Sequence, residues 1–314
     1  MKIVGTTGRE DIARAYIAEM RPGKLVEFCE SLEPAIPRSE KWVLIVSTMF
    51  GCPVGCQMCD AGGQYGGNLT VDEILEQIDF LIERRFPDRR VDVAKFKIQF
   101  ARMGEPALNP EVIDVLRKLP ERYDAPGLMP SVSSVAPEAG AGFFEELAEV
   151  KEEIYPGGRF QLQFSIHTTD TALRDRLIPV RKWDLAEVAG YGERFHRPGD
   201  RKITLNFALA EGMPIESEVL LKHFDPERFL LKITPLNPTY RAVQHGLTSR
   251  IDPEVAEGHS GLVAELESSG YQVLLSIGEP EENLIGSNCG QFVLRHLKAQ
   301  EALREAYTYG VVSD

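Results

Sequence analysis

The chain has 314 residues, of which 43% are hydrophobic, and its formal net charge is −13. This length allows one large domain or two small ones, and no apolar run is long enough to predict a membrane-spanning helix or a signal peptide. Because both are missing, we expect a soluble, cytoplasmic protein. The acidic balance argues against a large phosphate-rich partner held by charge alone.

Strand-like and helix-like segments alternate along most of the chain. We expect residues 1–40 to form one or two helices that pack on the main domain. The strands predicted after them are 41–48, 95–101, 128–135, 159–167, 202–210, 228–236 and 271–278. The predicted helices are 70–86, which opens with the capping-box pair Thr70 and Glu73, then 110–119, 142–154, 184–196, 252–270 and 289–308.

Six or seven strand–helix units in succession predict an α/β fold with a parallel sheet. Right-handed crossovers would coil such units into a full or partial barrel, or leave an open sheet. We therefore expect a helical extension over residues 1–40 and a barrel domain with a C-terminal helical cap over 41–314. In either arrangement, chemistry belongs at the carboxyl ends of the strands.

Three of the five cysteines, Cys52, Cys56 and Cys59, fall within eight residues, directly after the first predicted barrel strand. A closed zinc site needs four protein ligands, and no fourth cysteine lies nearby. A [4Fe–4S] cluster held by three thiolates would leave one iron open to an outside ligand. The residues alone also allow a zinc loop with a remote ligand, or three incidental thiols.

The segment "VSTMFGCPVGCQMC" with "GNLT" behind it resembles the RlmN/Cfr-type methyl synthases of the radical S-adenosylmethionine (SAM) superfamily. "ARMGEPALNPEVI", "SIHTTDTALRDRLIPV", "ITPLNP" and "NCGQF" follow in the order that this family shows. The resemblance implies a partial (β/α)6 barrel in which Cys52, Cys56 and Cys59 hold a [4Fe–4S] cluster. It further implies that this cluster cleaves SAM to a 5′-deoxyadenosyl radical.

The same resemblance implies that several strand-end residues contact SAM. A carboxylate at Glu105, after Gly104, could accept hydrogen bonds from the SAM amino group. The other positions are Ser133, Ser134, Ser165, His167 and Asn237, for which plain strand-end polarity is the alternative. Asn206 is expected to face the interior of the barrel.

In the resembling family, a late cysteine carries a methyl group, and a second cysteine, seven residues before the first cluster ligand, removes a proton. Cys289 stands in the matching "CGQ" context and is the candidate methyl carrier, with a buried structural thiol as the alternative. The position of the second cysteine is Ile45. Cys29, the remaining thiol, lies on a predicted N-terminal helix.

We therefore expect a radical SAM enzyme that methylates an sp2 carbon through Cys289. A heteroaromatic small molecule or a nucleotide is the expected substrate, and the acidic balance disfavours large RNA. The basic stretch 84–90 is expected to be a solvated helix end. Reducing equivalents would come from a partner such as flavodoxin or ferredoxin. The alternatives are direct hydrogen abstraction without methyl transfer, RNA adenine methylation, and a non-catalytic cluster or zinc protein.

Overall fold

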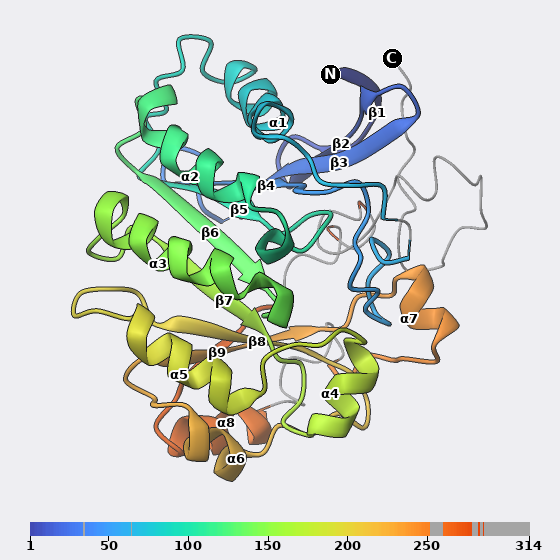
Figure 1. Ribbon diagram of the computed structural model, residues 1–314, viewed down its shortest axis with the longest axis vertical. Helices are drawn as coiled ribbons and strands as arrows, with labels where there is room; N and C mark the ends of the chain where they lie inside the picture. The colour runs from blue at the N-terminus through green and yellow to red at the C-terminus, as the bar shows by residue number, and fades with distance from the viewer. Residues whose placement is uncertain (34, 64, 252–259, 278–281, 283–284, 286–314) are drawn as a thin grey trace.

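The computed structural model describes residues 1–33, 35–63, 65–251, 260–277, 282 and 285. Their strands form one ten-stranded sheet in which the spatial order follows the chain from β1 to β10. Figure 1 shows this sheet with helices ranged along one side of it. The predicted helix 289–308 lies outside the described residues.

Seven parallel strands, β4 to β10, make the body of the sheet. Their bounds are β4 Lys41–Val46, β5 Lys95–Phe100, β6 Leu128–Ser134, β7 Gln161–Ser165, β8 Ile203–Leu209, β9 Phe229–Pro235 and β10 Gln272–Leu275. The helices are α1 Val71–Glu83, η1 Pro106–Leu108, α2 Glu111–Arg122, η2 Glu138–Gly140, α3 Ala141–Ile154, α4 Thr171–Leu177, α5 Leu185–Phe195, α6 Ser217–His223, α7 Tyr240–Gln244 and α8 Ser260–Ser268.

Sequential strand order places the helices on one face of the sheet, because right-handed crossovers between neighbouring strands all return on the same side. The other face becomes the inner face of the fold. Within the described residues, β1 pairs only with β2 and β10 only with β9, so the sheet is open. The predicted α/β fold with a parallel, partial-barrel sheet is confirmed.

The expected helical extension over 1–40 is wrong. Residues in this range form three antiparallel strands, β1 Lys2–Arg9, β2 Ala13–Arg21 and β3 Lys24–Ser31, that continue the main sheet through β4. Pro22 and Gly23 make a two-residue hairpin loop between the paired Arg21 and Lys24, and Gly23 adopts a φ of +71°. A Pro-Gly pair between two strand-like runs is a turn signal, and it outweighs the helical spacing of single apolar residues.

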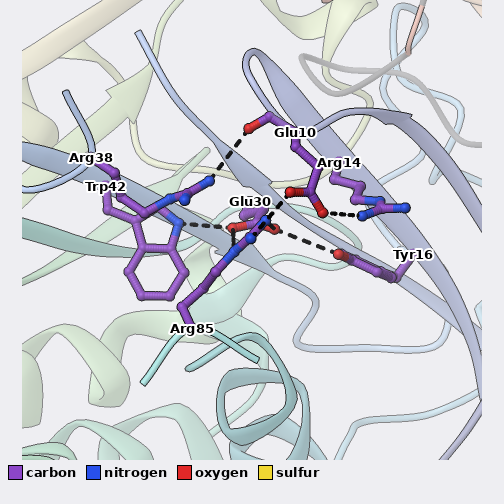
Figure 2. Close-up of polar contacts among 7 residues, drawn as sticks. All are labelled: Glu10, Arg14, Tyr16, Glu30, Arg38, Trp42 and Arg85. Atoms are coloured by element: carbon purple, nitrogen blue, oxygen red, sulfur yellow. Dashed lines mark hydrogen bonds and ion pairs between the residues drawn. The ribbon is translucent and has the colours of Figure 1, made fainter. Parts of the chain in front are cut away.

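A buried carboxylate fastens this N-terminal hairpin sheet to the helical layer (Figure 2). Glu30 of β3 accepts hydrogen bonds from Arg85 Nη2 at 2.9 Å and from Trp42 Nε1 at 3.0 Å. Arg85, which follows α1, also reaches Glu10 in the turn between β1 and β2. A buried charge is tolerated only when it is paired, so this contact fixes the position of β3 beside β4.

The strands from β4 on and the helices α1, α2, α3 and α5 agree with the predictions to within a few residues, and the capping box of Thr70 and Glu73 forms at the start of α1. Of the predicted helix 252–270, residues 252–259 lie outside the described residues, and α8 covers Ser260–Ser268. Three short helices, α4, α6 and α7, were not predicted because five to seven residues show too little periodicity. Among the described residues, no helix has the length and apolar character needed to cross a membrane.

Candidate active site

The cysteine loop leaves the carboxyl end of β4 and folds back on itself. Cys52 forms an isolated parallel bridge with Gly62, and Phe50 donates its backbone N–H to Gly67 O at 2.9 Å. A Cβ on Gly62 would lie 2.8 Å from the Cα of Gly55, so only glycine permits this crossing. The glycines between and after the cysteines therefore allow a compact loop.

The three predicted ligand thiols lie close enough to influence one another. Burial, followed by the charge of Cys59, raises the pKa of Cys52 to about 12. Burial and both neighbouring thiols raise the pKa of Cys56 well above its usual value. Two of the three crowded thiols, Cys52 and Cys56, thus ionise only with difficulty, which matches a site in which cations displace the protons.

The donor set of three cysteine thiols is one that iron–sulfur clusters use. The described residues contain no group of three or more His, Cys, Asp or Glu side chains arranged around one ion. A cubane cluster does not need such convergence, because each thiolate binds a different iron atom. Cysteine thiolates are also the usual ligands of these clusters.

A clamp that the sequence did not reveal holds the cysteine loop against the far edge of the sheet. Arg241 of α7 donates from Nε to Cys56 O at 3.0 Å and from Nη2 to Gly55 O at 2.9 Å. In return, the backbone N–H groups of Tyr240 and Arg241 donate to Asp60 at 3.1 and 2.9 Å. In the sequence, the one sign of these contacts is that Asp60 directly follows the third cysteine.

Glu105 stands at the carboxyl end of β5 with its carboxylate buried. Oε1 accepts from Ala107 N and Oε2 from Val135 N, both at 3.0 Å. Burial raises the pKa of Glu105 to about 7, although these amides and Ser134 favour the charged form. The hydrogen bonds hold the carboxylate in one orientation.

Gly104 lets the Glu105 turn approach the start of the cysteine loop. Its φ is +105°, and an added Cβ would lie 2.6 Å from Thr48 Oγ1 and 2.7 Å from Met49 Cβ. The backbone carbonyl of Met103 accepts from Thr48 N at 2.8 Å and from Met49 N at 3.1 Å. The Met-Gly-Glu-Pro segment is thus bonded directly to the residues that precede the cysteines.

The serines predicted at strand ends have different surroundings. Ser134 at the end of β6 contacts the Glu105 carboxylate and accepts from Ala136 N at 2.9 Å. The hydroxyl of Ser133 is buried and has no hydrogen-bond partner among the described residues. Ser165 ends β7 opposite Asn206 of β8, and both are partly exposed on the inner face.

His167 lies just beyond β7 and is held in one tautomer. Its Nδ1 accepts from Ala208 N at 3.0 Å, and burial lowers the pKa of the imidazole to about 3. The ring is therefore neutral, with its proton on Nε2. A φ of +67° is rare for a side chain of this size, which shows that the surrounding structure imposes this conformation.

The last two predicted site residues are Asn237 and Cys289. Asn237 lies between β9 and α7, next to the Arg241 clamp, and is partly exposed. Cys289 lies outside the described residues. The structure thus brings the predicted residues of the described part to the carboxyl ends of β4, β5, β6, β7 and β9, which is one edge of the sheet.

Comparisons with known proteins agree with this arrangement. The chain is 28% identical to the dual-specificity RNA methyltransferase RlmN of Wolinella succinogenes over 92% of this chain and 83% of the relative. A probable RlmN of Desulfitobacterium hafniense is also 28% identical, over 93% and 78% of the two chains. No model of a known protein family matches the chain.

Solved structures show the same fold. A radical SAM methyltransferase from Sphaerobacter thermophilus aligns with a TM-score of 0.72 at 20% identity, covering 93% of this chain and 81% of that one. SuiB from Streptococcus suis, bound to S-adenosylmethionine, aligns with a TM-score of 0.51 at 14% identity, covering 77% and 51%. Radical SAM methyltransferases use a [4Fe–4S] cluster and SAM. In sequence the chain is thus similar to RlmN-type RNA methyltransferases, and its fold is that of radical SAM enzymes.

Proposed function

We propose that Cys52, Cys56 and Cys59 hold the [4Fe–4S] cluster of this enzyme and leave one iron for SAM. The observation that carries this assignment is the compact cysteine loop, whose three thiols meet at the carboxyl end of β4 beside Glu105. When bound, the cluster supplies the electron that splits SAM into methionine and a 5′-deoxyadenosyl radical. Arg241 and Asp60 hold the loop in shape for this ligand set.

The surrounding strand ends offer complementary contacts to SAM. The oriented carboxylate of Glu105 would accept from the SAM amino group, and the resulting charge pair would keep Glu105 ionised at neutral pH. Ser133 contributes a buried hydroxyl that lacks a partner in the described structure, which favours a role in binding. Gly104, Ser134, Ser165, His167 and Asn237 complete the proposed SAM site at the same edge.

Cys289 is the proposed methyl carrier because it stands in the Cys-Gly-Gln context of the resembling family. Ile285 packs with Ile12 and Ala13, and Glu282 accepts a hydrogen bond from Ser31 Oγ at 2.8 Å. Because Ser31 pairs with Val43, these contacts place the chain beside the first half of β4, four residues before Cys289. The methyl group would go from Cys289 to an sp2 carbon of the substrate.

The proposed substrate is a small heteroaromatic molecule or a nucleotide. The curated relatives are named RNA methyltransferases, so RNA adenine is the competing target. Two observations favour the smaller substrate: the net charge of −13, and the ion pairs that the basic stretch 84–90 makes with the protein itself. Arg85 is engaged by Glu30 and Arg89 by Glu83, so neither presents a free charge to RNA.

One observation favours a second candidate function. Ile45 occupies the position at which the resembling methyl synthases carry their proton-abstracting cysteine. A radical SAM enzyme that removes hydrogen directly from its substrate has no need of that thiol. In this second function, the products from SAM would be 5′-deoxyadenosine and methionine without S-adenosylhomocysteine.

The test begins with anaerobic reconstitution of the whole chain with iron and sulfide. We expect each of the three loop cysteines to be required for cluster binding. Cys56→Ser should therefore lose the absorbance near 400 nm, whereas the matched variant Cys29→Ser should retain it. Incubation with SAM and dithionite, flavodoxin or ferredoxin should then yield 5′-deoxyadenosine. Full cluster retention in Cys56→Ser would refute the ligand assignment.

The methyl step needs its own measurement. A mass increase of one methyl group on the Cys289 peptide, with S-adenosylhomocysteine as co-product, would support methyl transfer. Its absence, with 5′-deoxyadenosine still formed, would favour direct hydrogen abstraction. Parallel incubations with nucleotide extracts and with unmodified ribosomal or transfer RNA would then separate the two substrate classes.

A further inference from the structure

The base of the cysteine loop is closed by contacts between its two ends. Thr48 follows β4 and Leu69 precedes α1, and Leu69 donates its backbone N–H to Thr48 O at 3.1 Å. Met49 and Asn68 form an isolated antiparallel bridge one step further into the loop. The three cysteines lie between these two ends, so the position of the base sets the position of the thiols.

Asn109 reaches both ends of the loop with one side chain. Its Nδ2 donates to Thr48 O at 2.7 Å and to Leu69 O at 2.9 Å, and its Oδ1 accepts from Glu111 N at 3.2 Å. Asn109 is fully buried. A buried amide whose two N–H donors are both bonded is held in one orientation, and an apolar replacement would leave buried carbonyl groups short of a donor.

A short, hydrogen-bonded turn joins Asn109 to Glu105. Asn109 N donates to Pro106 O and Leu108 N donates to Glu105 O, both at 3.0 Å, so the two residues flank η1. The Glu105 carboxylate is itself held by Ala107 N within this turn. Asn109 therefore connects the base of the cysteine loop to the carboxylate that is proposed to bind the SAM amino group.

We propose that Asn109 is a positioning residue for SAM binding, because it holds the three ligand thiols and the Glu105 carboxylate in one mutual arrangement. The inference rests on the proposed function, in which SAM contacts both the open iron and Glu105. A ligand held at two points binds tightly only if both points are already in place, since otherwise the cost of ordering the site offsets the contacts. Buried residues that orient such groups typically change affinity by about 10- to 100-fold when they are removed.

A second buried amide supplies a matched control. Gln77 of α1 accepts from Ser47 N at 3.0 Å and donates to Ser47 O at 3.1 Å, directly before the loop. Gln77 is as deeply buried as Asn109. Its hydrogen bonds among the described residues reach Ser47 and Glu73 and no residue of the Glu105 turn. Gln77→Leu should therefore lower stability, as Asn109→Leu does, without separating the loop from Glu105.

The first measurement is SAM affinity, by anaerobic calorimetry on the cluster-loaded chain without reductant and at equal iron content. We expect Asn109→Leu to bind SAM about tenfold more weakly than the wild type. Because Asn109 acts through Glu105, adding Glu105→Gln to Asn109→Leu should weaken binding by less than about twofold, although Glu105→Gln alone weakens it several-fold. In the Gln77→Leu background, Glu105→Gln should keep its full effect.

The second measurement is hydrogen exchange in the cluster-free protein, which needs no SAM. The Leu69 amide, which donates to Thr48 O, reports on the base of the loop, and the Ala107 amide, which donates to Glu105, reports on the turn. We expect both amides to exchange several-fold faster in Asn109→Leu than in Gln77→Leu, because only Asn109 joins the two segments.

Independent effects of Asn109→Leu and Glu105→Gln on SAM affinity would overturn the proposal, as would wild-type exchange of both amides in Asn109→Leu. If Asn109→Leu does not fold, Asn109→Ser takes its place. A wild-type chain that binds no SAM would refute the proposed function instead. In that case, faster exchange in Asn109→Leu would still show that Asn109 joins the loop to the turn.

Discussion

Cys29 of β3 lies directly opposite Ile45 of β4 in the antiparallel ladder. Opposed residues project from the same face, so the Cys29 thiol points to the side on which a cysteine at position 45 would project. The thiol that the sequence lacks at Ile45 is thus present one strand away. Its environment differs, however, because Cys29 is fully buried and burial raises its pKa far above the usual value of a thiol.

The first prediction concerns the reactivity of Cys29. A buried neutral thiol is a poor nucleophile and a poor base, so we expect iodoacetamide at pH 8 to leave Cys29 unmodified in the native, cluster-free protein. Cys59, which is partly exposed, should react first. Peptide mass spectrometry after a time course measures the order. Early modification of Cys29 would show an accessible thiolate and make it a candidate for the missing proton-abstracting thiol.

The second prediction tests the close approach at Gly104. Alanine there would meet Thr48 and Met49 and would hold a φ of +105°, so Gly104→Ala should lower the free energy of unfolding by about 2 kcal/mol or more. Gly142 in α3 has no heavy atom within 4 Å of an added Cβ, and Gly142→Ala should stabilise by about 0.5 kcal/mol. Urea denaturation of both variants measures these changes in the free energy of unfolding. Equal stability of the two variants would contradict the steric crowding at Gly104.

The third prediction concerns the clamp on the cysteine loop. Arg241→Met removes the two donors to the carbonyl groups of Gly55 and Cys56, so the loop should lose its fixed shape. We expect several-fold less iron retained per chain after gel filtration, with the cysteines intact. Arg176, an exposed arginine of α4, supplies the control variant Arg176→Met. Normal iron retention in Arg241→Met would show that the contacts of Arg241 are not needed for the cysteine loop to hold iron.

The fourth prediction follows from the ionisation of Glu105. Its pKa is raised to about 7 in the folded state, from an ordinary value of 4.5. The folded chain therefore holds a proton that the unfolded chain has lost, and stability decreases as pH rises from about 4.5 to about 7. The full effect is about 3 kcal/mol. Glu105→Gln should remove this component from the pH profile of urea unfolding in the cluster-free protein.

An exposed carboxylate provides the comparison for that experiment. Glu146→Gln, on the solvent side of α3, should leave the pH profile unchanged. Glu105→Gln should also weaken SAM binding, because the neutral amide cannot form a charge pair with the SAM amino group. A wild-type profile in Glu105→Gln would show that this carboxylate is not the titrating group.

The sequence alone determined the features that depend on neighbouring residues. Alternating periodicities predicted the parallel strands and most helices, because burial of one face imposes a period of two or 3.6 residues. The cysteine spacing predicted a three-thiolate loop, and the ordered motifs from Glu105 to Asn237 indicated the family. Each of these signals lies within a short segment, where local backbone geometry relates sequence to structure directly.

Only the tertiary structure decided the contacts between distant segments. Residues 2–31 became strands because a hairpin at Pro22–Gly23 could extend the edge of the sheet at β4. The pairing of Cys29 with Ile45 and the clamp from Arg241 to the cysteine loop join residues far apart in the chain. Strand register and sheet curvature set these contacts, and neither leaves a local pattern in the sequence.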